Sequence, residues 1–150
     1  MYERILLATD GTVASANAES HAIGLAATHG ATLHALYVVD ENVYTAYSGD
    51  EYVDEAEGPE HGLEEHGEET LAAVERRADE AGVDVVTALE RGQPAETVVD
   101  YADEAAVDLL VLGTRRRPPE YRSLIGSVTD RVVRLSGRPV LVVKTAADEA

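Results

Sequence analysis

The sequence predicts an α/β protein: a single domain over residues 1–150, with an open parallel five-stranded sheet and helices on both faces. The length is the first observation behind this prediction, because 150 residues suit one compact domain. The second is that short apolar runs alternate with amphipathic stretches, as they do in βαβ units. The third is an aliphatic composition: 45% of the residues are hydrophobic, yet Phe and Trp are absent.

The N-terminal half contains two predicted strands, over residues 4–9 and 31–39. Asp10-Gly11-Thr12 forms the turn after the first strand, and an Ala-rich helix then runs to about His29, with Gly30 as its stop. An acidic excursion punctuated by glycines and Pro59 covers about 40–62, and we expect it to lie on the surface. A helix follows over about 63–81.

The C-terminal half contains the other three strands. The third strand covers 83–90, and Pro94 suits the first turn of a helix that ends near Ala106. The fourth strand, 107–112, is almost continuously aliphatic, is therefore predicted to be central, and ends at Gly113. An arginine-rich loop leads to a helix that starts near 126–130, where Ser127 and Asp130 have capping-box spacing. The last strand covers 138–144.

Charge and cysteine content exclude several functions. The net charge of −17 repels nucleic acid and anionic membrane surfaces, so neither is predicted as a partner. No Cys is present, which excludes disulfides, thiolate nucleophiles and Cys-based zinc sites. No signal peptide or membrane span is recognisable, and we expect a cytoplasmic protein. The acidity, with 11 Arg against one Lys, favours a haloarchaeal source, although a GC-rich genome explains the Arg bias as well.

The charge is unevenly distributed along the chain. Residues 40–69 hold 12 acidic side chains and no Lys or Arg, whereas residues 114–138 hold seven Arg against Glu120 and Asp130. Such an Arg cluster indicates a place where anions are held. The alternative is that some of these Arg pair with neighbouring acids or form a solvated helix face.

Ligands of open α/β sheets bind beyond the carboxyl ends of the strands, where neighbouring connections leave to opposite faces. Here that crevice is predicted between the first and fourth strands. Gly113 lets a ligand approach the backbone, and the free amides of Gly126, Ser127 and Val128 begin a helix whose dipole favours phosphate. Neither a Walker loop nor a dinucleotide fingerprint is present.

The same segments resemble the universal stress protein family along nearly the whole chain. The shared features are Ala8-Thr9-Asp10-Gly11-Thr12, Tyr37-Val38-Val39-Asp40 and the helix entry Gly92-x-Pro94-Ala95-Glu96. The most specific is the family's ATP motif G-x2-G-x9-G-[ST], which falls on Gly113, Arg116, Gly126 and Ser127 and is followed by Arg138-Pro139-Val140-Leu141-Val142-Val143. Arg116 departs from the motif, since it occupies the position of the second glycine.

The resemblance implies a strand order of 3-2-1-4-5 and a regulatory protein that binds ATP, with Mg²⁺ as its companion ion, or a related adenine nucleotide. Thr9 and Asp10 would lie at the adenine and ribose end, Val38 would offer backbone groups to adenine, and Gly113 would lie by the ribose and phosphates. Gly126, Ser127, Val128 and Thr129 would hold the phosphate tail. Arg116 is a further candidate phosphate ligand through its charge rather than through the motif. No catalytic base is evident, so we expect no enzyme activity beyond slow ATP hydrolysis. The family also implies a homodimer that pairs the last strand, through Val140, Leu141, Val142 and Val143.

Alternatives remain open at this point. Arg116 either substitutes charged hydrogen bonds for lost backbone contacts, or blocks the phosphate site and leaves an interaction module that binds no nucleotide. A flavodoxin-like redox protein or a nucleotide hydrolase is a second alternative. Individually, Asp10, Val38 and Ser127 could be only turn, core and cap residues. His61 and His66 lie about 140° apart on a helix and cannot share a metal ion.

Overall fold

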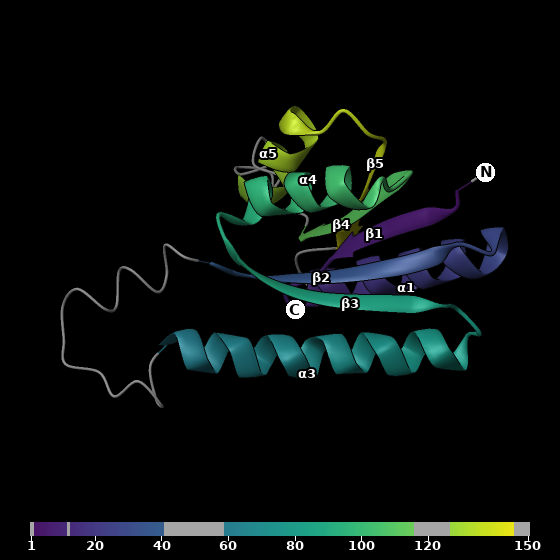
Figure 1. Cartoon of the computed structure of the whole chain (residues 1–150), viewed down its shortest axis with the longest axis horizontal. Helices are drawn as coiled ribbons and strands as arrows, with labels where there is room; N and C mark the ends of the chain where they lie inside the picture. Colours follow the sequence, from purple (N-terminus) through teal and green to yellow (C-terminus); the bar gives the residue numbers. More distant parts are fainter. Residues whose placement is uncertain (1, 12, 41–58, 116–126, 146–150) are drawn as a thin grey trace.

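The computed structural model describes residues 2–11, 13–40, 59–115 and 127–145. Five strands form one parallel sheet in the order β3-β2-β1-β4-β5 (Figure 1). The fold class and strand order predicted from the sequence are therefore confirmed. The strands are β1 (Arg4–Ala8), β2 (Thr32–Asp40), β3 (Val85–Gly92), β4 (Leu109–Arg115) and β5 (Val140–Thr145).

Helices cover both faces of the sheet (Figure 1). One face is covered by α1 (Val13–His29) and α3 (Pro59–Glu80), the other by α4 (Pro94–Ala105) and α5 (Ser127–Leu135). Small side chains let α1 pack closely on the sheet, where Ala18, Ala22 and Ala26 are fully buried. On the other face, α4 contributes Val98 and Ala102 to the core.

The central strands are buried on both faces, which explains their continuous aliphatic sequence. In β1, Leu6 packs toward α4 and α5, whereas Ile5 and Leu7 pack toward α1 and α3. All three side chains are fully buried. Burial of an aliphatic side chain of this size contributes about 1.5–3 kcal/mol, so this two-sided core is the main source of stability.

Several element boundaries differ from the sequence prediction. Helix α3 begins at Pro59, so residues 59–62 belong to the helix rather than to the acidic excursion. Proline is favoured there because the first helical residue needs no amide hydrogen bond. The rest of the excursion, residues 41–58, lies outside the described residues.

Strand β4 does not end at Gly113. It continues to Arg115, and Gly113 pairs with Val143 of the edge strand β5. The sequence suggested an end because glycine usually interrupts a strand, but pairing with β5 keeps residues 113–115 extended. Strand β3 is likewise displaced two residues from the prediction and covers Val85–Gly92.

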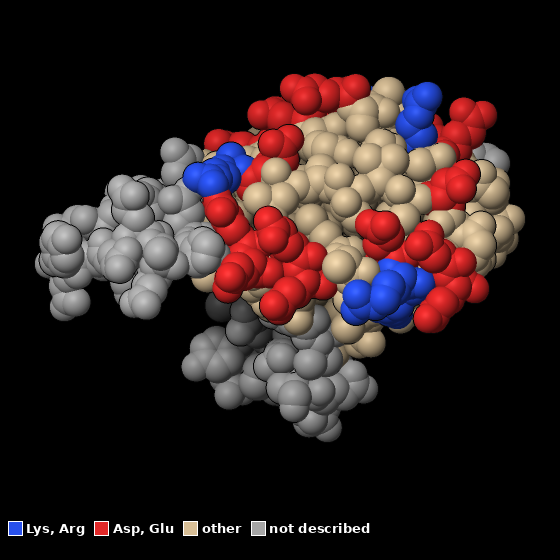
Figure 2. Space-filling model, turned by 60° about the horizontal axis from the view of Figure 1, so that its bottom comes forward, with Lys and Arg blue, Asp and Glu red and all other residues tan. Residues whose placement is uncertain are grey.

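On the face on which α3 lies, acidic side chains cover more of the surface than basic ones do (Figure 2). Three arginines of the predicted cation cluster are paired with carboxylates: Arg131 with Glu96, Arg134 with Asp130, and Arg138 with Asp103. For these three, pairing with neighbouring acids is the correct interpretation.

In the described ranges, no helix is both long enough and apolar enough to span a bilayer.

Candidate functional site

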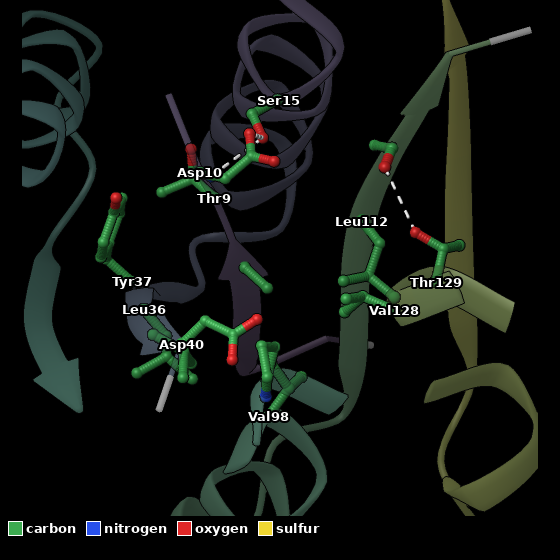
Figure 3. A pocket seen from close by; sticks show the side chains of 14 residues that line it. Thr9, Asp10, Ser15, Leu36, Tyr37, Asp40, Val98, Leu112, Val128 and Thr129 are labelled. Atoms are coloured by element: carbon green, nitrogen blue, oxygen red, sulfur yellow. Dashed lines mark hydrogen bonds between the residues drawn. The ribbon is translucent and has the colours of Figure 1, made fainter. Parts of the chain in front are cut away.

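A pocket of about 300 Å³ lies at the carboxyl ends of β1, β2 and β4 and reaches the starts of α4 and α5 (Figure 3). Its position fits the rule for open parallel sheets, because the chain leaves β1 and β4 toward opposite faces. A volume near 300 Å³ is at the lower end of the range typical for small-molecule sites.

Apolar side chains form much of the pocket wall. Leu36 comes from β2, Leu112 from β4, and Pro94 and Val98 from the first turns of α4. In Figure 3, Leu36 and Val98 lie on one side of the pocket and Leu112 on another. Walls of this kind suit a flat apolar ring, with orientation supplied by the few polar groups.

Six of the nine site residues predicted from the sequence line this single pocket. They are Thr9, Asp10, Val38, Gly113, Val128 and Thr129. Ser127 is the first residue of α5, next to the lining residue Val128, and only its backbone is described. Arg116 and Gly126 lie outside the described residues.

The turn after β1 is fixed by local hydrogen bonds. Ser15 Oγ accepts from the Asp10 amide at 3.0 Å and donates to Asp10 Oδ1 at 2.6 Å, which orients the Asp10 carboxylate (Figure 3). The Gly11 amide donates to Thr9 Oγ1 at 3.3 Å. Gly11 has a φ of +80°, a conformation that residues with a Cβ rarely adopt.

Helix α3 contacts this turn through His66. The His66 Nε2 atom lies 3.0 Å from the carbonyl oxygen of Asp10, so that this nitrogen donates the hydrogen bond. The His66 ring also packs edge-to-face against Tyr37, which lines the pocket. A Cβ added at Gly11 would lie 2.5 Å from His66 Nε2, so glycine is needed here for space as well.

A buried carboxylate stands behind the same turn. Glu19, on α1, accepts a hydrogen bond from Thr9 Oγ1 at 3.0 Å and pairs with Arg77 of α3 at 2.8 Å. Burial raises the pKa of Glu19, and this outweighs the lowering caused by Thr9 and Arg77. The negative charge of Asp10 raises the pKa further.

The start of α5 forms the opposite part of the pocket. Val128 and Thr129 line it, and Thr129 Oγ1 donates to the Gly113 carbonyl at 3.3 Å (Figure 3). The first amides of a helix have no partner within the helix, and its dipole favours an anion at this end. The nine-residue helix α5 therefore presents groups suited to a phosphate.

The arrangement can bind a small ligand that combines an apolar ring with polar or anionic groups. Among the described residues, no group of three His, Asp or Glu side chains is placed to hold a metal ion. The Asp10 and Asp40 carboxylates both line the pocket, so a ligand has to meet negative charge there.

Sequence reasoning missed several residues at this site. Glu19, His66 and Arg77 carried no signal, because their partners lie 10 to 58 positions away in the chain. Ser15 belonged to the predicted Ala-rich helix and Asp40 to the segment that closes the second strand, but nothing in the pattern placed their side chains at a ligand.

Comparison with known proteins identifies the family. The model of the universal stress protein family matches residues 1–144. A universal stress protein of Methanocaldococcus jannaschii, MJ0531, is 36% identical, over 99% of this chain and 86% of the relative. Further relatives come from Bacillus subtilis and Staphylococcus aureus, so the haloarchaeal source remains a prediction from composition.

Solved structures share the fold. Hypothetical protein MJ0577 superposes with a TM-score of 0.75 at 24% identity, covering 96% of both chains. A universal stress protein crystallised in complex with cAMP has a TM-score of 0.66 at 26% identity and covers 95% of this chain and 97% of its own. With a family model matching nearly its whole length, this chain belongs to the universal stress protein family.

Proposed function

We propose that the pocket binds an adenine nucleotide, with ATP as the leading candidate, and that occupancy acts as a regulatory signal in the stress response. The observation that carries this proposal is that one pocket joins apolar walls to the start of a helix. Apolar walls suit a purine ring, and a helix start suits a phosphate. The similar protein that was crystallised with cAMP supports the same ligand class.

In this proposal the ligand lies across the carboxyl end of the sheet. Thr9, Asp10 and the backbone of Val38 contact the base and ribose, and Gly113 lies by the ribose. The amides of Ser127, Val128 and Thr129 receive the phosphates, together with Gly126 and Arg116. Mg²⁺ would accompany the phosphates of ATP and reduce their repulsion with the acidic chain.

The proposed role is binding rather than catalysis. Among the residues that the structure describes, the titratable groups that line the pocket are the carboxylates of Asp10 and Asp40 and the phenol of Tyr37. Burial and the charge of Asp10 raise the pKa of Tyr37, so that its phenol stays protonated and is not available as a base. We therefore expect ATP hydrolysis to be slow at most, and we place the protein in the cytoplasm, where ATP is available.

Calorimetric titration with ATP and Mg²⁺ tests the proposal. It should be done at high salt, because a net charge of −17 repels an anionic ligand at low ionic strength. We expect saturable binding of one nucleotide per chain, and an adenine nucleotide among the small molecules released from the purified protein. Absence of heat with ATP, ADP, AMP and cAMP at every salt concentration would overturn it.

The main alternative is an interaction module that binds no nucleotide, because Arg116 replaces the motif glycine. The substitution Arg116→Gly separates the two functions. If Arg116 holds phosphate, the substitution weakens ATP binding; if it blocks the site, the substitution creates binding where the unaltered protein has none.

We also propose a homodimer formed by β5. Strand β5 is an edge of the sheet, and Val140, Leu141 and Val142 are only partly buried in the single chain. Val133 and Leu135, on the neighbouring helix α5, are 43% and 48% exposed. An exposed apolar edge favours pairing with a second strand. Light scattering at high salt should give twice the mass of one chain, and the mass of a single chain would contradict the dimer.

A further inference from the structure

Glu19 is a buried carboxylate that the proposed function leaves without a role. It lies on α1, where the residue is only 8% exposed. Its position is not part of a turn or helix cap, since α1 runs from Val13 to His29. Burying an ionised carboxylate is unfavourable unless both of its oxygens are hydrogen-bonded. The contacts of the two Glu19 oxygens therefore show how the protein accommodates this buried charge.

Both oxygens have partners, and each oxygen bonds a different residue. Glu19 Oε2 accepts from Arg77 Nη1 at 2.8 Å, while Arg77 Nη2 donates to Ser20 Oγ at 2.6 Å. Glu19 Oε1 accepts from Thr9 Oγ1 at 3.0 Å. Helix α3, through Arg77, thus holds the carboxylate against a residue that lines the pocket.

This contact decides how the Thr9 hydroxyl can bond. A hydroxyl has one proton and two lone pairs, and an ionised carboxylate can only accept. The proton of Thr9 is therefore directed to Glu19, and the amide of Gly11 donates to Thr9 Oγ1 at 3.3 Å. With a ligand, Thr9 Oγ1 can therefore only accept a hydrogen bond, through its remaining lone pair.

We propose that Glu19 is a positioning residue that makes the Thr9 hydroxyl an acceptor, so that the pocket selects ligands with an amino or hydroxyl donor at this point. The identity of the ligand as an adenine nucleotide rests on the proposed function. The orientation of Thr9 by Glu19 does not, because it follows from contacts within the chain.

The substitution Glu19→Gln tests the direction of this bond with almost no change in shape. A glutamine side chain has one oxygen and one NH₂ group. Since Arg77 can only donate, the glutamine oxygen faces Arg77 and the NH₂ group faces Thr9. The NH₂ group then donates to Thr9 Oγ1 and occupies the lone pair intended for the ligand.

We expect Glu19→Gln to weaken ATP binding about tenfold in calorimetry at high salt, the effect of one lost hydrogen bond. In a Thr9→Val background the same substitution should add no further loss, because Glu19 acts through Thr9. Asp103→Asn is the matched control: its carboxylate pairs with Arg138 beside Val107, which precedes β4, and ATP binding should be unchanged.

A pH profile distinguishes positioning from a purely structural role. Asp10 and Arg77 are the charged groups that act on Glu19, and burial dominates in raising its pKa above 4.5. Protonated Glu19 would itself donate to Thr9, so the affinity of the unaltered protein should fall as the pH decreases through that pKa. The Glu19→Gln variant should lack this step, while titrations of ATP and Asp10 are common to both proteins.

A measurement without ligand tests the orientation of Thr9 by Glu19 separately from the proposed binding of a nucleotide. The amide resonance of Gly11, which donates to Thr9, should titrate by NMR with a step that is absent in Glu19→Gln. If ATP does not bind but this step is present, the proposed function fails and the orientation of Thr9 stands. If the step is missing, or if Glu19→Gln binds ATP as well as the unaltered protein does, the role of Glu19 is wrong.

Discussion

The two ends of β1 are each held by a carboxylate from another part of the chain, and the two carboxylates have opposite effects on stability. At the amino end, Asp108 Oδ2 accepts from the amides of Glu3 and Arg4 at 2.8 and 3.0 Å, and these bonds lower the pKa of Asp108. At the carboxyl end, burial raises the pKa of Glu19.

The opposite pKa shifts of Asp108 and Glu19 indicate different roles for the two ends of β1. Ionised Asp108 stabilises the fold, because it pairs with amides that the first strand leaves open. Ionised Glu19 lowers stability relative to its protonated form, although Arg77 and Thr9 offset part of the desolvation. An unfavourable charge kept beside a pocket is typical of a binding site, whereas Asp108 at the opposite end stabilises the start of β1.

The largest effect is expected at Gly11. We expect Gly11→Ala to lower stability by about 2–3 kcal/mol and to weaken nucleotide binding, because φ is +80° and the new Cβ would meet His66 and Thr70. Gly82→Ala is the matched control, with a φ of +72° and open space around it. Urea unfolding measures both, and equal losses would show that contact with α3 contributes nothing at Gly11.

At the amino end, Asp108→Ala should lower stability by about 1 kcal/mol without changing nucleotide affinity. The loss should be present above pH 3.8, the ordinary pKa of the group, and should disappear as the pH falls through the lowered pKa of the folded state. Unfolding curves at several pH values check the sign. A change in ATP affinity would contradict the separation of the two ends.

The substitution His66→Phe tests the contact between α3 and the turn after β1. It keeps ring packing against Tyr37 but removes the donor to the Asp10 carbonyl, so we expect a loss of about 0.5–1 kcal/mol together with weaker ATP binding.

His34→Phe is its control on the other face of the sheet. His34 Nδ1 shares a hydrogen bond of 2.9 Å with the Tyr101 hydroxyl, and the two rings are in edge-to-face contact. The loss of stability should be similar, but calorimetry should find ATP affinity unchanged. Equal effects on affinity would mean that the contact between His66 and the turn has no special role.

The smallest effect is the pH dependence of stability in Glu19→Gln. Because the folded pKa of Glu19 is raised, its stabilising contribution is present below pH 4.5 and is lost as the pH rises through that pKa. The stability of Glu19→Gln relative to the unaltered protein should therefore increase as the pH rises through this window. If the free energies of unfolding of the two proteins changed in parallel with pH, Glu19 would titrate as it does in the unfolded chain.

Much of the fold could be predicted because it depends on local patterns. Aliphatic runs such as Leu110 to Leu112 indicate buried parallel strands wherever they occur, and Gly30 and Gly82 mark helix ends by their conformational freedom. Boundaries were less accurate, since Gly113 continues β4 only through pairing with a neighbouring strand.

The residues of the site also fall into two groups: those that local patterns predicted and those that only tertiary packing brings to the pocket. Thr9 and Asp10 were predictable because they follow the central strand β1, and parallel strands bring their carboxyl ends to one edge. Gly113 and Thr129 were predictable from the glycine motif that the chain shares with its family. The contacts from α3 were not, because which face of that helix meets the turn depends on how it packs against β2 and β3.

The sequence by itself determined a five-stranded parallel sheet, its family and the edge at which a ligand site forms, because hydrophobic periodicity and short motifs act over neighbouring residues. Only the tertiary structure decided that Arg77, Glu19 and Thr9 form one connected path to the pocket. The physical reason is that a hydrogen bond between residues 58 positions apart requires helix packing to bring both into contact, and no local pattern encodes that distance.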